Sequence, residues 1–150
     1  DLQLAVWFSE ALTKEKGFAG LRDSLKLVSG LQEVFWENLY PEIDDGDQEG
    51  RANALSAFDK LTADAIREKP LTEGEGLSWI NWDESTRFDI PENLDAVEYS
   101  EQQRYKELRQ QAEAENRVTG DRWRKARAAT SRLFAEQTFY ILGECWTEFE

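Results

Sequence analysis

Residues 17–44 read GFAGLRDSLKLVSGLQEVFWENLYPEID and form a glycine-bracketed junction between two helical patterns. Gly17 lies where the C-terminal cap of the first helix is expected, and the second helix begins at Gly20. Pro41 ends the second helix because its ring cannot continue a helical hydrogen-bond ladder. Only Phe18 and Ala19 separate the two helices, so the chain must fold back into an antiparallel pair.

Both helices of this pair have an apolar side. The first, over residues 2–16, repeats apolar side chains at helical spacing, namely Leu4, Ala5, Phe8, Ala11 and Leu12. The second carries a wider stripe, which implies contact with more than one neighbour. Its members are Leu21, Leu25, Val28, Leu31, Phe35 and Leu39, with Leu27 and Val34 at the edge.

The rest of the chain is also helical in pattern. A helix over residues 50–69 directs apolar side chains inward and is closed by Pro70; these are Ala54, Leu55, Phe58, Leu61, Ala65 and Ile66. Two capping boxes, Asn81 with Glu84 and Ser100 with Gln103, predict helices over 81–88 and 101–116. A long helix runs from Thr119 to the end. No stretch alternates for long enough to predict a sheet. The fold class is therefore all-α, a bundle of five or six mostly antiparallel helices.

The composition fits one domain of a longer protein. In 150 residues, 40% hydrophobic side chains can supply one continuous core. The chain begins with Asp1 and contains no methionine, so we expect a fragment. No apolar run is long enough to cross a bilayer, and no signal peptide opens the chain. The single Cys145 excludes an intrachain disulfide. These features favour the cytoplasm and argue against direct membrane insertion.

The charge distribution limits the partners. A net charge of −13 makes nucleic acid and anionic membranes poor partners, because binding phosphate needs a basic surface. Positive charge gathers between Asn116 and Arg132, where six basic residues accompany one acid, Asp121. A basic segment in an acidic chain most often pairs with acids of the same chain or of a symmetry mate.

The residue types argue against an enzyme. The chain contains no histidine, which removes the commonest general base and the commonest zinc ligand. No glycine-rich loop of the phosphate-binding or dinucleotide-binding kind is present. A pair of carboxylates stays possible among 31 acidic residues, but such abundance makes a close pair uninformative. We therefore expect no catalytic residue, no cofactor and no metal site.

One acidic loop imitates the start of a calcium-binding loop. Residues 45–50 read DGDQEG, with acids at the first, third and fifth positions and glycine at the sixth. The twelfth position is Ser56, where a calcium loop requires a bidentate glutamate. The segment is therefore interpreted as an acidic turn.

Aromatic residues supply the candidate interaction sites. Trp7, Trp36, Trp123 and Trp146 lie within amphipathic helical patterns and are expected to fill space between helices. Trp79 and Trp82 follow a glycine-rich loop, and with Phe88 they are the candidates for an exposed patch. The last helix is apolar around most of its circumference, so it is either central in the fold or shared with another chain. The candidates for the shared face are Tyr140, Trp146 and Phe149. A homodimer is the expected way to bury it.

The N-terminal third combines tryptophans, glycines and leucines in a specific order: Asp1, Leu2, Ala5, Val6, Trp7, Ala11, Leu12, Gly17, Phe18, Ala19, Gly20, Leu21, Leu25, Leu27, Gly30, Leu31, Trp36, Leu39 and Pro41. This pattern resembles the end of the N-terminal (ImpA-type) region of the TssA family, cytoplasmic organisers of bacterial type VI secretion. Its structural motif comprises Gly17, Phe18, Gly20, Leu21, Trp36 and Pro41. The resemblance implies that residues 1–44 end this region and residues 45–150 form a middle helical domain.

The resemblance also implies a function. The chain would be a non-catalytic scaffold that helps to assemble the contractile tail tube and sheath on the baseplate and membrane complex. Its expected partners are proteins of those assemblies and a second copy of itself, with higher rings requiring a missing C-terminal domain. Two alternatives stay open. One is a relative with the same N-terminal region that caps or stops the sheath, and the other is an acidic decoy or immunity-type protein that binds a basic partner.

Overall fold

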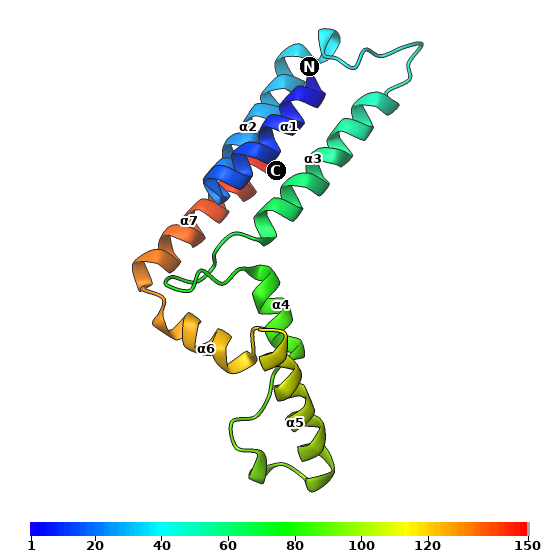
Figure 1. The fold of residues 1–150 in the computed structure, drawn as a ribbon. Coiled ribbons are helices and arrows are strands. Elements are labelled where there is room, and N and C mark those ends of the chain that lie inside the picture. The colour runs from blue at the N-terminus through cyan, green and yellow to red at the C-terminus, as the bar shows by residue number, and fades with distance from the viewer. Residues whose placement is uncertain (150) are drawn as a thin grey trace. The chain divides into compact units, whose positions relative to one another are not determined.

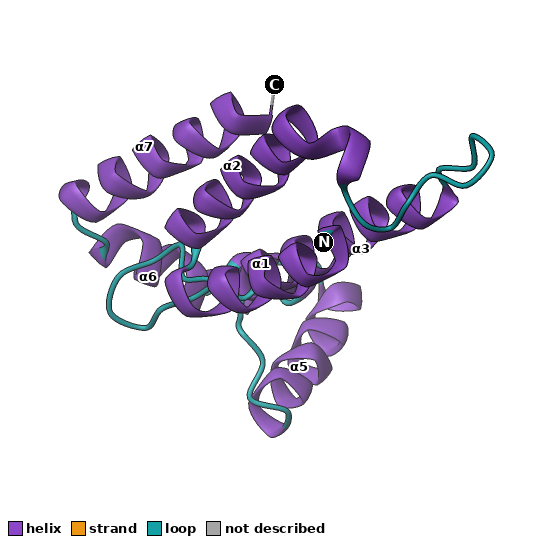
Figure 2. Ribbon diagram, turned by 90° about the horizontal axis from the view of Figure 1, so that it is seen from above, coloured by secondary structure: helices purple, strands orange, loops and turns teal. Residues whose placement is uncertain are grey.

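The computed structural model describes residues 1–149 (Figure 1). Within that range the chain forms seven α-helices, two short 3-10 helices and no strand, which confirms the predicted all-α class (Figure 2). Its contacts divide into two compact units, one made of Asp1–Lys69 with the segment that starts at Glu136, and the other of Pro70–Ala135. A chain with two compact units can be described as one domain or as two. The predicted single domain therefore stays a prediction.

The first unit is built on the predicted helical pair. The helices α1 (Leu2–Lys16) and α2 (Phe18–Phe35) run antiparallel, and α1 also packs against α3 (Glu49–Arg67) (Figure 1). The short 3-10 helix η1 (Trp36–Asn38) follows α2. The last helix, α7 (Arg132–Phe149), lies beside α2 in both ribbon views (Figure 2).

The seam between α1 and α2 depends on small residues. Gly17 caps α1 with φ of 63°, a left-handed conformation that favours glycine, and its N–H donates to Thr13 O at 2.9 Å. A Cβ at Gly20 would lie 2.2 Å from Leu12 O, so the two backbones approach too closely for any side chain there. Ser24 Oγ donates to Ser9 O across the same seam. The chain therefore turns at Gly17, as predicted, but α2 already begins at Phe18, so the predicted linker of Phe18 and Ala19 lies within the helix. The two helices also pack more tightly than the sequence predicts.

This close packing corrects the predicted face of the first helix. The face of α1 that is buried carries Leu2, Ala5, Val6, Ser9 and Thr13. Leu4 and Phe8, which the periodicity assigned to the inner face, are 60% and 56% exposed. The buried side follows the neighbours of α1, because the Leu12 backbone meets Gly20, Ser9 O accepts from Ser24 Oγ, and Leu2 and Val6 enter the core. The buried core of this unit comprises Leu2, Val6, Val28, Leu39 and Ala54.

The end of α2 also differs from the prediction. The α-helix stops at Phe35 rather than continuing to Pro41. After η1 the chain becomes extended at Leu39, which carries that side chain into the core with 2% exposure. Val34 and Phe35, placed in the predicted stripe, are instead exposed.

The second unit contains α4 (Trp79–Arg87), η2 (Leu94–Ala96), α5 (Tyr99–Ala114) and α6 (Gly120–Ala129). Helices α4 and α6 pack on each other. The buried core combines Leu77, Val118 and Ala126, with Trp123 partly buried against them. The unit thus has its own small apolar cluster, separate from the core of the first unit.

Both predicted capping boxes are wrong. The box of α4 uses Ser78 and Asn81, one turn earlier than predicted. Glu84 is engaged elsewhere, since its carboxylate accepts from the Val118 N–H at 3.0 Å. Helix α5 begins at Tyr99, before Ser100. The side chain of Gln103 donates to Glu107 within the helix instead of reaching back to the cap.

The long final helix of the prediction is interrupted at Thr130, which has an extended backbone conformation. Thr130 Oγ1 donates to Ala126 O and accepts from the Glu73 N–H at 3.0 Å. The Glu73 carboxylate in turn accepts from the Ser131 N–H. These bonds satisfy backbone groups that an unbroken helix would have paired internally. They explain why the described chain has more helices than predicted.

Candidate interaction surfaces

A buried arginine organises the segment after α2. Arg51, at the start of α3, is 2% exposed. Its guanidinium donates to three backbone carbonyls, with distances of 2.8 Å to Pro41 O, 2.7 Å to Trp36 O and 2.5 Å to Leu39 O. Its Cζ also lies 4.4 Å from the centroid of the Trp36 ring. Carbonyl dipoles and the aromatic face together stabilise a charge that has been removed from water.

The buried role of Arg51 was not predicted from the sequence, although its spacing from neighbouring apolar residues indicates it. Arg51 precedes Ala54 and Leu55 by three and four positions, and Phe58 by seven, so it shares their inward face. An arginine in phase with a buried stripe indicates a buried charge with specific partners. The contact involves two motif residues, because the guanidinium bonds to the backbone carbonyls of Trp36 and Pro41 and also lies over the Trp36 ring. The Trp36 side chain therefore helps to fix the fold.

Helix α7 is attached to α2 mainly through side chains. Arg22 Nη1 lies 2.7 Å from a Glu144 carboxylate oxygen, and Lys26 Nζ lies 3.2 Å from Glu148. Cys145 Sγ donates to the Phe18 carbonyl at 3.3 Å. The hydrogen bond from Arg22 lowers the pKa of Glu144, while burial raises the pKa of the Cys145 thiol. The attachment is therefore polar as well as apolar.

An apolar groove of about 350 Å³ opens between α7 and the α2 and α3 helices. Leu21, a predicted motif residue, lines it from α2, and Phe58 and Ile66 line it from α3. Two of the predicted interaction residues, Trp146 and Phe149, line it from α7, and their rings lie 6.1 Å apart. The structure thus brings these two together at the mouth of a groove.

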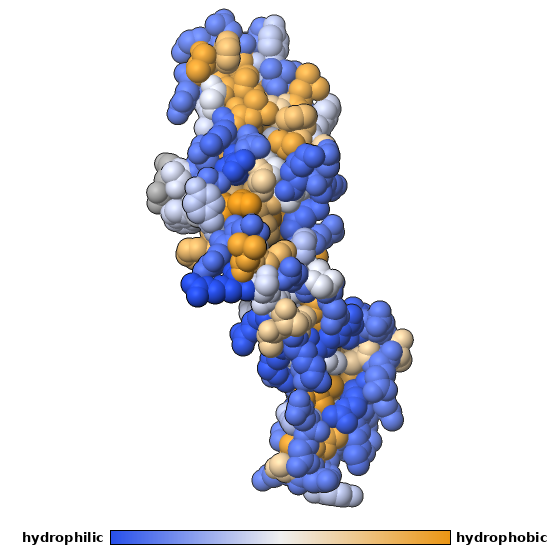
Figure 3. All heavy atoms as spheres, turned by 90° about the vertical axis from the view of Figure 1, so that its left-hand side faces the viewer, coloured by the Kyte–Doolittle hydropathy of each residue, from blue (hydrophilic) through white to orange (hydrophobic). Residues whose placement is uncertain are grey.

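Much of α7 remains in contact with solvent. Phe139, Tyr140, Trp146 and Phe149 are each more than 60% exposed. The exposure of Trp146, and likewise that of Trp7 on α1, corrects the prediction that these rings fill space between helices. Hydrophobic residues gather in patches among hydrophilic ones over the first unit on the face drawn in Figure 3. Exposed apolar patches of this kind commonly mark surfaces that bind another protein.

The second predicted patch is only partly present. Trp79 and Trp82 are 40% and 43% exposed on α4, with ring centroids 6.1 Å apart. Phe88 is buried at the end of the same helix and does not belong to an exposed patch. Its backbone carbonyl accepts from the Gly120 N–H, which holds this end of α4 against the start of α6. The candidate patch on this unit is therefore the tryptophan pair.

The basic segment pairs with acids of the same unit, as predicted. Arg117 bonds to Glu84, Arg122 to Glu75, Arg124 to Asp89 and Lys125 to Asp121, at distances of 2.7–3.0 Å between nitrogen and oxygen. Arg122 and Arg124 thereby tie α6 to the preceding segments of its unit, whereas Lys125 and Asp121 pair within α6 and Arg117 joins the segment before α6 to α4. Such pairing leaves less positive charge to bind a ligand.

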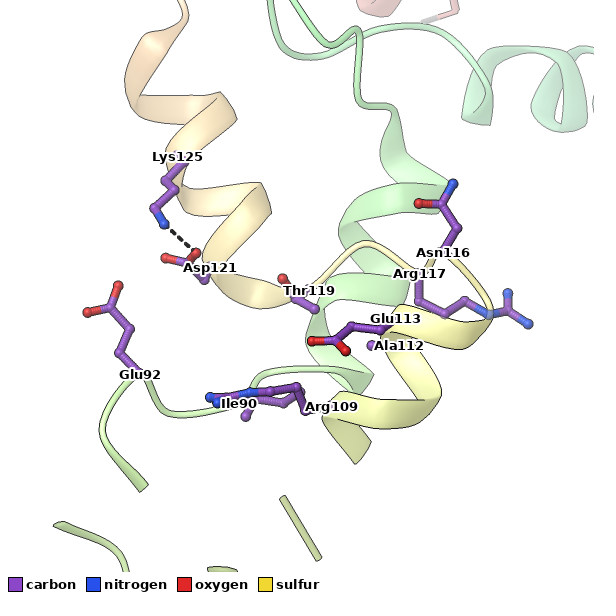
Figure 4. Close-up of a pocket in the computed structure, with 10 residues that line it drawn as sticks. All are labelled: Ile90, Glu92, Arg109, Ala112, Glu113, Asn116, Arg117, Thr119, Asp121 and Lys125. Carbon is purple, nitrogen blue, oxygen red and sulfur yellow. Dashed lines mark ion pairs between the residues drawn. The ribbon is translucent and has the colours of Figure 1, made fainter. Parts of the chain in front are cut away.

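A polar pocket of about 530 Å³ lies between α5 and α6 (Figure 4). Arg109 and Lys125 line it together with Glu92, Glu113 and Asp121. The hydrogen bond from Lys125 lowers the pKa of Asp121. Figure 4 shows the Arg117 side chain directed away from the other lining groups. Charges of both signs line the pocket and partly neutralise one another. The charge of the pocket therefore favours no particular ligand.

The acidic loop forms a tight turn. Asp45 and Gly46 have φ values of 48° and 86°, and the Asp47 carboxylate accepts from the Glu49 N–H just before α3. Across residues 1–149, no group of three or more acidic or cysteine side chains is placed to hold a metal ion. The same described residues contain no helix that is both long and apolar enough to span a membrane.

Residues 1–60 match the family ImpA_N, described as ImpA, N-terminal, type VI secretion system. The chain is also similar to a solved N-terminal domain, including the conserved ImpA_N region, of the TssA component of the type VI secretion system from Burkholderia cenocepacia. The identity is 25%, the TM-score is 0.79, and the similarity covers 99% of this chain and 56% of that one. Comparison with curated proteins gave no match.

These similarities confirm the resemblance that the sequence carries, and they identify the fold as that of a TssA-type N-terminal domain. The family match extends beyond residue 44, where the sequence analysis places the end of the N-terminal region. The structural similarity extends over α4–α7 as well. The chain spans about half the length of the solved chain, 56% of it.

Proposed function

We propose that this chain is a non-catalytic structural part of a bacterial type VI secretion system. It acts as a cytoplasmic scaffold that helps to assemble the contractile tail tube and sheath on the baseplate and membrane complex. The observation that carries this proposal is the similarity of almost the whole chain to the N-terminal domain of a TssA component. The match of its first 60 residues to ImpA_N supports the same assignment.

The chemistry of the surface supports a role in protein binding. Large apolar side chains are exposed on α7 and at the tryptophan pair of α4, and also on α1 and at the end of α2. Aromatic anchors of this kind supply much of the binding energy of protein interfaces. Arg122 and Arg124 of α6 are engaged in intramolecular ion pairs instead. Partners, including a second copy in a homodimer, are therefore expected to bind through apolar contacts with a polar rim.

Pull-down experiments with purified tail-tube, sheath, baseplate and membrane-complex proteins would test the proposal. We expect at least one of them to be retained in moderate salt, since apolar contacts survive screening. Binding that disappears as salt is raised would favour the acidic decoy instead. Retention of none of these proteins, by a chain that is folded by circular dichroism, would contradict the scaffold role.

A further inference from the structure

One side of α7 carries an apolar stripe with the spacing of a helix seam. Phe139, Leu142, Trp146 and Phe149 recur at intervals of three, four and three residues, as in helices that pack along their length. Their exposures are 80%, 38%, 63% and 70%. The ion pairs with α2 come from Glu144 and Glu148, which lie outside the stripe, and Cys145 lies between them and the stripe and lines the groove. The stripe is thus a second face of the helix, turned to solvent.

The stripe continues into the apolar groove. Leu142, Trp146 and Phe149 form one wall of the groove, α3 contributes Phe58 and Ile66, and α2 contributes Leu21 and Leu25. Asp59 is the charged residue among the groove's lining side chains. A groove lined by three helices, with an apolar surface and few charges, suits the apolar face of a further helix.

We propose that the α7 helix of a second copy occupies this surface, antiparallel to the first, and that the stripe is the centre of a twofold interface. This inference rests on the proposed homodimer and specifies its surface. Aromatic side chains bury ~150–250 Å² each. At the observed exposures, the four stripe residues expose on the order of 500 Å². The walls of the groove add to this, and a standard interface takes about 800 Å² from each partner.

The spacing of the stripe also sets the register of the two helices. In a twofold arrangement each contact occurs twice, and a residue on the axis meets its own copy. With Leu142 on the axis, Phe139 of one copy lies opposite Trp146 of the other, because these residues are three positions before and four positions after the axis. The register therefore gives two aromatic pairs around a central leucine pair. Aromatic pairs of this kind add stability beyond their buried area.

The net charge gives the dimer a distinctive dependence on salt. Two chains with a charge of −13 each repel one another. Added salt screens this repulsion and leaves the apolar contact intact. We therefore expect the dimer of the 150-residue chain to become tighter, or to stay unchanged, as salt is raised. Weakening by salt would overturn the apolar interface.

Sedimentation of charged variants tests the surface. Phe139→Glu and Trp146→Glu should each raise the dissociation constant of the dimer at least tenfold, because each buries a charge in both copies. Leu133→Glu is the matched control, since Leu133 is 64% exposed on α7 but lies outside the stripe. Circular dichroism checks that each variant is folded. A monomeric unsubstituted chain, or a dimer that tolerates both stripe variants, would overturn the proposal.

Cross-linking tests the register. In a Cys145→Ser background, Leu142→Cys should form a disulfide-linked dimer under mild oxidation, since the two sulfurs meet at the axis. Tyr140→Cys in the same background should not form one. A reversed result would contradict the antiparallel register. These outcomes are independent of the pull-down, which reports secretion-system partners, so loss of the dimer and loss of the scaffold role are separately observable.

Discussion

The guanidinium of Arg51 lies over the indole ring of Trp36, 4.4 Å from its centroid, while it donates a hydrogen bond to the backbone carbonyl of the same residue. Together with the bonds to Leu39 and Pro41, this contact fixes the segment that leaves α2. Leu39 can then enter the core. One side chain of α3 therefore determines how the predicted helical pair is closed.

Replacing Arg51 should destabilise the chain strongly. Arg51→Ala leaves three carbonyls without their donors and opens a cavity, so we expect a loss of about 3 kcal/mol or more, as for other buried charged hydrogen bonds. Arg51→Lys keeps the charge but cannot reach three carbonyls in a planar fork, and should recover only part of this loss. Urea unfolding, monitored by tryptophan fluorescence, measures the free energy of unfolding of both variants.

Arg87→Ala is the control, because Arg87 forms an exposed ion pair with Asp83 on α4. Its cost should be within about 0.5 kcal/mol. An Arg51→Ala chain as stable as this control would show that the carbonyl bonds do not hold the segment.

Two glycines of α2 should respond in opposite ways to alanine. Gly20→Ala forces a methyl group toward Leu12 O, at 2.2 Å in the present backbone, so α1 and α2 must separate. We expect a loss of about 2 kcal/mol, within the range for overpacked sites. Gly30→Ala has open space around the new methyl group and should stabilise the helix by about 0.5–1 kcal/mol. Thermal unfolding monitored by circular dichroism measures both changes.

Equal effects from the two alanines would contradict the close approach of α1 and α2 at Gly20. This pair of positions is informative because both glycines lie in the same helix and differ mainly in their surroundings.

The sequence predicted the helical class and the junction well, because both depend on local signals. The spacing of apolar residues indicates where the helices lie, and Gly17 marks the turn between the first two, whereas α2 ends at Phe35, well before Pro41. The inward face of α1 was less predictable. Leu4 and Phe8 are apolar and in phase, yet the side of α1 that packs against α2 and α3 carries Ser9 and Thr13. That outcome depends on a tertiary contact, which periodicity within one helix does not record.

The first capping box failed for a related reason. Glu84 has the right spacing to cap with Asn81, but it bonds to the Val118 N–H and to Arg117, residues more than thirty positions away. Similarly, Thr130 ends α6 because it bonds to Glu73. Long-range partners compete with local caps for the same oxygen atoms. For the candidate surfaces, sequence located the aromatic residues, whereas only packing separates exposed Trp82 from buried Phe88.

The attachment of α7 to α2 should weaken in acid. The pKa of Glu144 is lowered, first by its hydrogen bond from Arg22. A lowered folded-state pKa means that the ionised form stabilises the fold, fully so above the unfolded value of about 4.3, and that this contribution is lost as pH falls through the folded value. Glu144→Gln should therefore lower Tm slightly at neutral pH and have less effect near pH ~3.

Glu33→Gln, at an exposed position of α2, provides the comparison and should change Tm little at either pH. A Glu144→Gln difference that grows as the solution is acidified would mean that the carboxylate does not stabilise the docked helix in its ionised form. Thermal scans at several pH values distinguish these results.

The aromatic residues of α4 should separate into a structural and an exposed group. Phe88→Ala removes a buried ring and should cost about 3 kcal/mol or more, as for other core phenylalanines. Trp79→Ala and Trp82→Ala remove rings that are 40% and 43% exposed, and each should cost about 1 kcal/mol. If the tryptophan pair binds a secretion-system partner, these two variants should reduce its retention in a pull-down while remaining folded. Full retention by the double variant Trp79→Ala/Trp82→Ala would exclude the pair as a binding surface and leave α7 as the candidate.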